Sequence, residues 1–394
     1  MNDLSKKKAG SRLLFTNIAY WMTDGCYTPF LSSYYRSIGL SSREIGILLA
    51  IGPACAICIQ PVWAMFSDRS GKRKKVLELV TVGAAIASLM YYGGKSFTYL
   101  FFATVCMAVF YYALLPLCDA IVIESARRFG CDFARIRMGG TLGYAFVVFM
   151  IGFFLERVPA AQFALLFLML LLFLTAQRHI PKEETEEGQS WERRAVSKKK
   201  GGRIFQSREI LFVLAFVFVG QADLAFSGTF LGVYVLELGY SQSLVGILSC
   251  ISALSEIPIL FCASKLMKRF SAMQMLAFSS LMMAVRIFLT GLGVVPTMVI
   301  AQLMQSVTYM IMYFCVTTYI SEHVCEGKAS QGQSILSVVQ MGLAAVTANI
   351  AGGFVGERLS TQIAFYTASV VVLVGAILVI VVYRLYVHGR IKKV

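Results

Sequence analysis

Seven charged residues lie inside long apolar stretches of this 394-residue chain. On insertion scales, one charge near the centre of a bilayer costs on the order of 3 kcal/mol, so such a residue is a functional candidate by default. Five of the seven are acids and two are arginines: Asp24, Asp119, Glu124, Asp223, Glu256, Arg137 and Arg286. A carboxylate that is removed from water binds a proton more readily, which suits a proton carrier. Alternatively, these acids hold Na⁺ or a cationic substrate.

Asp119 and Arg137 are the pair best suited to bind a ligand. A guanidinium group presents a planar, bidentate fork to hydroxyls or to a carboxylate. The alternative is a fixed salt bridge between two neighbouring helices. Glu256 and Arg286 have the same two interpretations: they form a structural pair, or they belong with Asp223 to a proton-coupling network.

Other polar residues accompany these charges. Asp24 and Asp223 occupy corresponding places in two halves of the chain, and we expect both to line a substrate cavity. Gln221, Gln305 and Gln340 add hydrogen-bonding groups, whose alternative role is to join neighbouring helices. Glu124 stands close to two arginines in the sequence, so we expect it to form a surface ion pair.

The elements that carry these residues must be membrane helices. The chain is 58% hydrophobic and 14% charged, whereas a soluble domain contains about 25% charged residues. A transmembrane helix needs about 20 mostly apolar residues. The apolar stretches are unbroken and lack the alternation of an outer-membrane barrel. We therefore predict an all-α membrane protein with twelve transmembrane helices, at 12–35, 43–66, 76–94, 98–124, 137–155, 158–177, 208–236, 242–266, 272–293, 296–321, 331–355 and 360–386.

The basic residues sort to one side of this topology. Thirty of the 36 lysines and arginines lie on the side of the amino terminus. The positive-inside rule assigns that side to the cytoplasm. We expect a multi-pass protein of the inner (cytoplasmic) membrane with both termini in the cytoplasm, and we interpret Lys6, Lys7 and Lys8 as a retained anchor because no cleavage site follows. The net charge of +15 thus reflects topology and not nucleic-acid binding.

The chain contains an internal repeat. Phe30-Leu31 matches Phe230-Leu231, and Gly46-Ile47-Leu48 matches Gly246-Ile247-Leu248, at a constant offset of 200 residues. A polar segment rich in both signs of charge separates the halves. We predict two pseudo-symmetric six-helix bundles, 1–177 and 208–394, joined by a cytoplasmic linker at 178–207. Such a repeat places a ligand site between the halves near the middle of the bilayer.

The stretch Ser67 to Lys75 resembles the cytoplasmic loop motif of the major facilitator superfamily, an Asp-Arg/Lys-x-Gly-x-Arg-Lys pattern. Gly71 permits a tight reversal, and Asp68 can pair with cations or with a helix N-terminus. The resemblance implies that Asp68, Arg69, Gly71 and Arg73 form a conformational latch between the halves in the outward-facing state. The alternative is a basic loop that only sets topology.

A narrower resemblance spans almost the whole chain: it is similar to the lactose permease group, which includes phenylpropionate and nucleoside symporters. In the stretch 116–144, Asp119 and Arg137 match the acid and arginine that hold the sugar in that family, and Tyr144 matches its stacking aromatic. Glu256 and Arg286 match as well. The family's helix 10 His and Glu and helix 11 Lys are replaced by residues that cannot form a histidine relay: Gln305, Thr308 and Gln340.

These features predict a secondary active transporter, a proton-coupled symporter of a small polar solute such as a sugar, nucleoside or aromatic acid. The coupling ion is expected to be H⁺ or, alternatively, Na⁺. Two other hypotheses remain open: a proton-driven exporter of drugs or amphipathic cations, and a membrane sensor that does not transport. We expect no enzyme activity, no cofactor and no metal site, because no catalytic motif is present and the ten cysteines are scattered. The architecture implies a monomer in the lipid bilayer.

Overall fold

A computed structural model describes residues 3–180, 205, 209–324 and 335–391. Within these ranges the first half contains seven helices: α1 (Asp3–Tyr27), α2 (Leu31–Ser37), α3 (Ser42–Ser70), α4 (Arg73–Met90), α5 (Phe97–Phe129), α6 (Phe133–Leu155) and α7 (Ala161–Arg178). The second half contains α9 (Ile210–Glu237), α10 (Gln242–Arg269), α11 (Ala272–Gly291), α12 (Val295–Leu303), η1 (Ser306–Met310), α13 (Ile311–His323), η2 (Val338–Ala344), α15 (Ala345–Arg358) and α16 (Thr361–Ile391).

These elements make the predicted all-α, twelve-helix membrane fold. Ten of the described helical segments are long and apolar enough to cross a bilayer. The other two spans are α1 with α2, and α4, and both carry basic residues near their first turns that lower their hydropathy. Large apolar side chains are exposed around the outside, among them Phe102, Leu211 and Leu385, each more than 60% exposed. On a membrane protein such a surface is what lipid tails cover.

The boundaries differ from the predicted spans in three places. The stretch 12–35 is not one helix, because the chain breaks at Thr28–Phe30, where Pro29 lies, and continues as the short helix α2. The tenth and eleventh spans each contain a π-helical turn, η1 and η2. A π-turn inside an α-helix is rare and frequently marks a functional site. Part of the span 331–355 and nearly all of the linker 178–207 lie outside the described residues.

Local sequence signals explain several helix ends. Ser41 and Glu44 form a reciprocal capping box at the start of α3, and Ser271 with Gln274 does the same at the start of α11. At the other end, α3 stops at Gly71, whose φ of 63° is left-handed. Glycine adopts this conformation without steric cost, so it terminates the helix and turns the chain into α4.

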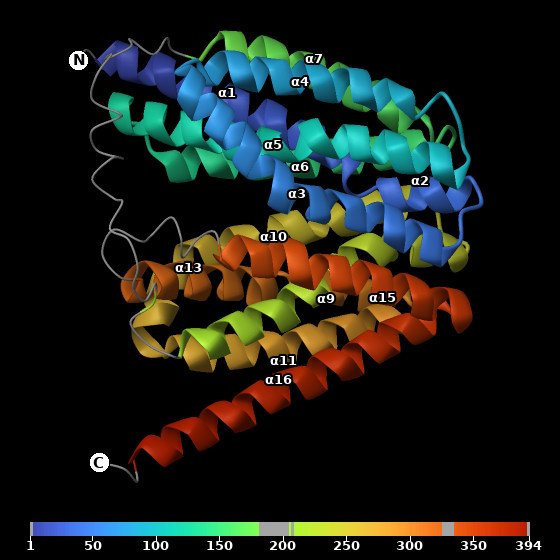
Figure 1. Ribbon diagram of the computed structural model, residues 1–394, viewed down its shortest axis with the longest axis vertical. Coiled ribbons are helices and arrows are strands. Elements are labelled where there is room, and N and C mark those ends of the chain that lie inside the picture. Colours follow the sequence, from blue (N-terminus) through green and yellow to red (C-terminus); the bar gives the residue numbers. More distant parts are fainter. Residues whose placement is uncertain (1–2, 181–204, 206–208, 325–334, 392–394) are drawn as a thin grey trace.

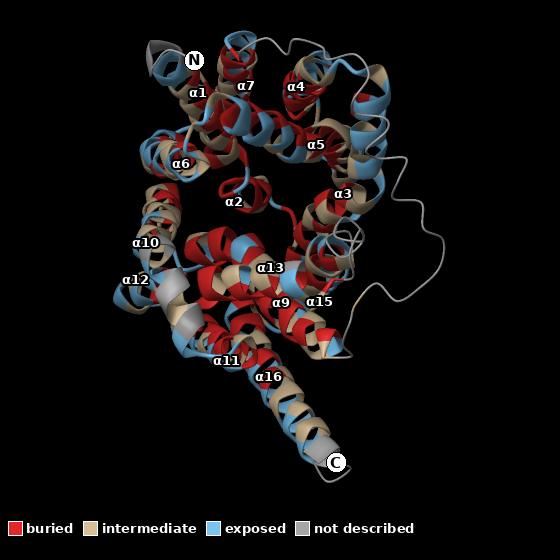
Figure 2. Cartoon of the chain, turned by 90° about the vertical axis from the view of Figure 1, so that its left-hand side faces the viewer, coloured by how far each residue is buried: buried red, intermediate tan, exposed pale blue. Residues whose placement is uncertain are grey.

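The helices of each half pack mainly against one another. In the first half α1 contacts α5, α6 and α7, while α4 packs on α5 and α7. In the second half α16 packs on α9 and α11. Figure 1 shows both chain ends on the same side of the molecule, with α2 at the opposite end. In Figure 2 the far part of α16 projects from the bundle and is largely exposed.

The two halves contact each other along two helix pairs, α6 with α10 and α3 with α15, which Figure 2 shows on opposite sides of the bundle. In both pairs glycines meet. A Cβ on Gly46 would lie 3.1 Å from the Cα of Gly353, and one on Gly246 would lie 3.1 Å from the Cα of Gly152. Without side chains in the way, the helix backbones approach closely at these two crossings.

Candidate functional site

The first half presents Asp119 on α5 and Arg137 on α6, both half-buried. Asp119 Oδ1 and Arg137 Nη1 are each buried without a hydrogen-bond partner. No direct ion pair between the two is found in the part of the chain that the structure describes, although Arg137 acts electrostatically on the Asp119 carboxylate. Instead, the guanidinium carbon of Arg137 lies 4.0 Å from the ring centroid of Trp21 on α1. The members of the predicted pair are thus not bonded to each other in this structure, and each keeps a buried polar atom without a partner.

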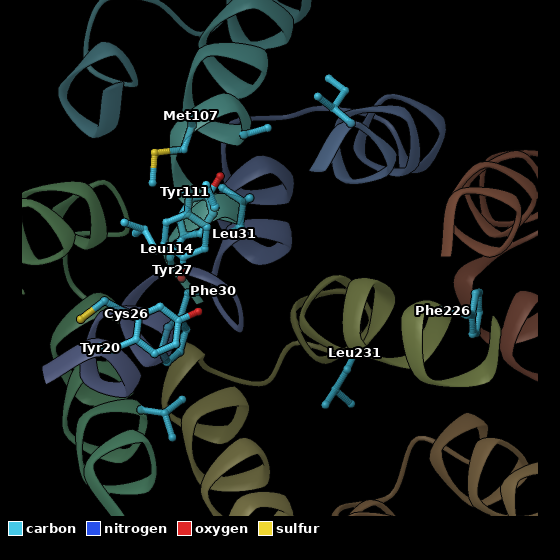
Figure 3. Close-up of a cluster of buried hydrophobic side chains, with 14 of the residues drawn as sticks. Tyr20, Cys26, Tyr27, Phe30, Leu31, Met107, Tyr111, Leu114, Phe226 and Leu231 are labelled. Atoms are coloured by element: carbon cyan, nitrogen blue, oxygen red, sulfur yellow. The ribbon is translucent and has the colours of Figure 1, made fainter. Parts of the chain in front are cut away.

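Asp24 lies in the last turn of α1 and is held by hydroxyls. Its Oδ1 accepts hydrogen bonds from Thr28 Oγ1 at 2.7 Å and from Tyr111 OH at 2.8 Å. Figure 3 shows Tyr111 of α5 grouped with Tyr20 and Tyr27 of α1. Tyr27 OH is in turn 3.1 Å from the hydroxyl of Tyr91 on α4. Asp24 thus sits at the edge of a buried, hydroxyl-rich region of the first half.

The second half contains a polar network that runs across four helical segments. Asp223 on α9 accepts a hydrogen bond from Ser227 Oγ at 3.3 Å and leaves its Oδ2 without a partner. Arg286 on α11 is 4% exposed and donates from Nη2 to Gln302 Oε1 at 3.4 Å. Arg286 Nε and Nη1 are buried without a partner. The network therefore retains unsatisfied donors and acceptors inside an apolar bundle.

Glu256 on α10 belongs to the same region. Gln305 Nε2, just before η1, donates to Glu256 Oε1 at 3.2 Å. Both Arg137 of the first half and Arg286 of the second act electrostatically on the Glu256 carboxylate. Glu256 and Tyr144 also interact electrostatically across the halves. Glu256 thus interacts electrostatically with polar groups of both halves, as does Tyr309 with Arg137. Among the described residues Glu256 forms no direct ion pair with Arg286.

The remaining predicted site residues are less closely joined to this region. Tyr144 on α6 meets Trp21 edge-on, with ring centroids 6.3 Å apart. Gln221 on α9 and Gln340 in η2 are half-buried. Neither makes a hydrogen bond to the charged residues within the described ranges. Gln305, in contrast, contacts Glu256 directly and keeps its own Oε1 unpaired.

The predicted latch residues lie at the helix α3 terminus rather than in a loop. Asp68 and Arg69 belong to the last turn of α3, and Gly71 caps it. Arg73, the first residue of α4, forms ion pairs with Asp68 and with Glu124 of α5. Glu124 therefore forms an ion pair, as expected, and one partner is Arg73 of α4.

The described contacts between the halves gather near α2, away from the chain ends. Ser33 Oγ donates to Gln242 Oε1 at 2.8 Å, and Arg36 pairs with Glu237 at 3.0 Å. Asn349 Nδ2 of α15 donates to the carbonyl oxygen of Leu49 at 3.0 Å. The charged site lies on the side of these contacts that faces the chain ends.

Sequence reasoning missed Trp21, Tyr111 and Gln302. Trp21 can be assigned to the site only once α1 is known to pack against α6. The available signal was that Arg137, Gly140 and Tyr144 share one face of a helix, which could receive a side chain from a neighbouring helix. Gln302 precedes Gln305 by three residues, so both amides are expected on one face of an apolar helix. That shared face was the signal from which Gln302 could have been predicted. Tyr111 was one of many aromatic residues and carried no signal that set it apart.

Comparisons with known proteins agree with this architecture. The MFS_1 like family matches residues 12–367. The uncharacterised transporter YwbF of Bacillus subtilis (strain 168) is 26% identical over 266 residues, which are 66% of this chain and 64% of that protein. The maltose permease of Geobacillus stearothermophilus is 24% identical over 360 residues, 90% of each chain. A crystal structure of a variant of the nucleoside transporter NupG matches with a TM-score of 0.81 and 16% identity, covering 95% of this chain and 99% of that one.

Proposed function

Because this chain belongs to the MFS_1 like family and is a secondary transporter, we propose that it is a proton-coupled symporter of a small polar organic solute. The solute is a sugar, a nucleoside or an aromatic acid. One observation carries the proposal: Asp119 and Arg137 interact electrostatically, and each has a buried polar atom that no described protein group satisfies.

Unsatisfied polar atoms favour a polar ligand. Leaving a buried donor or acceptor without a partner costs about 1–3 kcal/mol. A hydroxyl group satisfies both residues at once, because it can donate to the Asp119 carboxylate and accept from the Arg137 guanidinium. A carboxylate satisfies only Arg137. We assign six further residues to substrate binding: Tyr144, Asp24, Gln221, Asp223, Gln305 and Gln340.

Proton coupling is assigned to the second half. Asp223 and Arg286 are buried and Glu256 is half-buried, so this set holds one more acid than arginine. Glu256 responds electrostatically to Arg137 as well as to Arg286. A solute that binds Arg137 therefore changes the field at Glu256, which gives a physical route from substrate binding to proton binding.

Alternating access is proposed to occur by rocking of two units, 1–177 and 208–394, about the site between them. The contacts near α2 support this division, because they close one end of the bundle while the charged residues lie beyond them. With both termini in the cytoplasm of an inner-membrane protein, this arrangement corresponds to an inward-facing state. In the outward-facing state, the cytoplasmic ends of the two halves are proposed to be held together by the latch residues Asp68, Arg69, Gly71 and Arg73.

The test is transport by purified protein in proteoliposomes that contain a pH-sensitive dye. Maltose, uridine and 3-phenylpropionate are added outside in turn. We expect one class of solute to acidify the lumen, and we expect Asp119→Asn and Arg137→Gln to abolish this signal. Arg157→Gln, an exposed arginine outside the site, serves as the matched control. Proton movement driven by cationic dyes, with none driven by the three solutes, would replace the symporter by an exporter.

A further inference from the structure

Trp21 packs its ring face against the guanidinium group of Arg137. The guanidinium carbon lies 4.0 Å from the indole centroid, well inside the range of about 6 Å over which a cation is attracted to an aromatic face. In the described residues Arg137 has no ion-pair partner, and its Nη1 has no hydrogen-bond acceptor. The ring face is therefore the contact that fixes the direction of the guanidinium.

The indole itself is held in place by α6 and by neighbouring aromatic rings. A Cβ on Gly140 would lie 2.4 Å from Trp21 Cδ1, so only glycine leaves room for the ring against this helix. Tyr20 and Tyr144 contact the indole edge-on, with centroids 5.4 Å and 6.3 Å away. Arg137, Gly140 and Tyr144 follow one another on a single face of α6, and Trp21 inserts into that face.

The surroundings of Trp21 are polar, which argues against a role limited to apolar packing. Trp21 Nε1 is buried without an acceptor. One turn earlier on α1, both amide atoms of Asn17 are buried without partners, and the residue is 0% exposed. Packing alone does not call for two unsatisfied polar side chains on consecutive turns of one helix.

We propose that Trp21 is a positioning residue of the substrate site. Its ring face binds the guanidinium group of Arg137, so that this group does not form an ion pair with a protein carboxylate. The inference rests on the proposed function and deepens it. Because no carboxylate pairs with Arg137, its Nη1 is free to donate a hydrogen bond to a hydroxyl group of the solute. The same hydroxyl group can donate to the free Oδ1 of Asp119. The favoured substrate is a hydroxylated molecule rather than a simple carboxylate.

The first measurement needs no substrate. The chain has three tryptophans, so Trp63→Phe and Trp191→Phe leave Trp21 as the only indole reporter. In that background we expect Arg137→Gln to change the emission intensity and wavelength of Trp21, because a charge is removed from its ring face. Arg157→Gln is the control and should leave the emission unchanged. An emission spectrum that is the same in the Arg137→Gln and Arg157→Gln proteins overturns the proposal.

The second measurement is the KM and kcat of uptake of maltose, uridine and 3-phenylpropionate. Trp21→Phe keeps an aromatic face and should stay within about threefold of the parent KM, whereas Trp21→Leu should raise KM about tenfold with little change in kcat. Gly140→Ala should also raise KM, by displacing the indole, while Gly228→Ala should not, since a Cβ there meets nothing within 4 Å.

The two measurements separate this inference from the function on which it rests. Equal KM values for Trp21→Leu and Trp21→Phe contradict the positioning role. If the parent protein takes up none of the three solutes, the proposed function fails, and the emission of Trp21 still decides whether the ring holds Arg137.

Discussion

A tight backbone contact between the halves gives a direct test of the rocking motion, through the substitution Gly46→Ala. A Cβ at this position would lie 2.3 Å from the backbone oxygen of Asn349, about 1 Å inside ordinary van der Waals contact. Backbone atoms cannot rotate away, so α3 and α15 must separate by a similar distance. Such a shift lengthens the hydrogen bond from Asn349 Nδ2 to the Leu49 oxygen, now 3.0 Å, to about 4 Å, beyond hydrogen-bonding range.

The expected size of the effect follows from these losses. One hydrogen bond contributes about 1 kcal/mol, and overpacking a tight contact costs at least about 1 kcal/mol more. Together they disfavour the state that is closed near α2 by roughly 2 kcal/mol, which changes the ratio of the two conformations about 30-fold. Gly46→Ala should therefore populate the state that is open at this end.

Spin labels on Ser37 and Arg358, which are exposed near the contacts of α2, report this change. Electron–electron distance measurements in the Gly46→Ala protein should show a longer distance that is minor in the parent. Gly228→Ala, which adds the same methyl group to open space, is the matched control. Identical distance distributions for the two variants would refute the assignment of this crossing as the contact that closes the transporter.

Three further predictions concern other parts of the molecule. Glu256→Gln should abolish solute-driven acidification of proteoliposomes but retain solute exchange, because Glu256 is proposed to carry the proton; loss of exchange as well would make it a binding residue. Arg36→Ala removes an ion pair with Glu237 whose side chains are 37% and 24% exposed, so the thermal midpoint should fall by no more than about 2 °C. Gly71→Ala places a Cβ at a φ of 63° and should cost about 1–2 kcal/mol of stability, measured by thermal unfolding against Gly228→Ala.

The overall architecture follows from the sequence because membrane helices are specified by length and hydropathy. Every predicted span corresponds to one, two or three helical segments in the described parts of the chain. The two π-turns were not predictable, since η1 and η2 contain no proline and no other break signal. The break after α1 had such a signal in Pro29, but the long apolar stretch around it outweighed the single residue.

The candidate site was predictable in its members and not in its contacts. Charges in apolar stretches stand out in a sequence, so Asp119, Arg137 and Glu256 were identified. Which groups meet depends on how α1, α5 and α6 pack, and no sequence pattern shows that Arg137 lies on Trp21 rather than on Asp119. The sequence predicted a ligand-binding pair with an ion pair as the alternative, and the contact of Arg137 with the Trp21 ring was not foreseen.

The two halves pack against each other in the same way on both sides of the bundle, but we assign different roles to their charged residues. The same kind of glycine crossing joins them on both sides of the bundle, as a repeated scaffold requires. Each half also carries two acids and one arginine in its interior: Asp24, Asp119 and Arg137 in the first, and Asp223, Glu256 and Arg286 in the second.

The environments of the two arginines differ. Arg137 is half-buried against a ring, whereas Arg286 is 4% exposed and donates to Gln302. Both arginines leave donors without a partner, but Arg137 is the more exposed of the two and is therefore better placed to meet an incoming solute. The deeper Arg286, which interacts electrostatically with Asp223 and Glu256, is better placed to influence the protonation of those acids. On this argument substitutions at Arg137 should act first on solute affinity, and substitutions at Arg286 on the proton stoichiometry of transport.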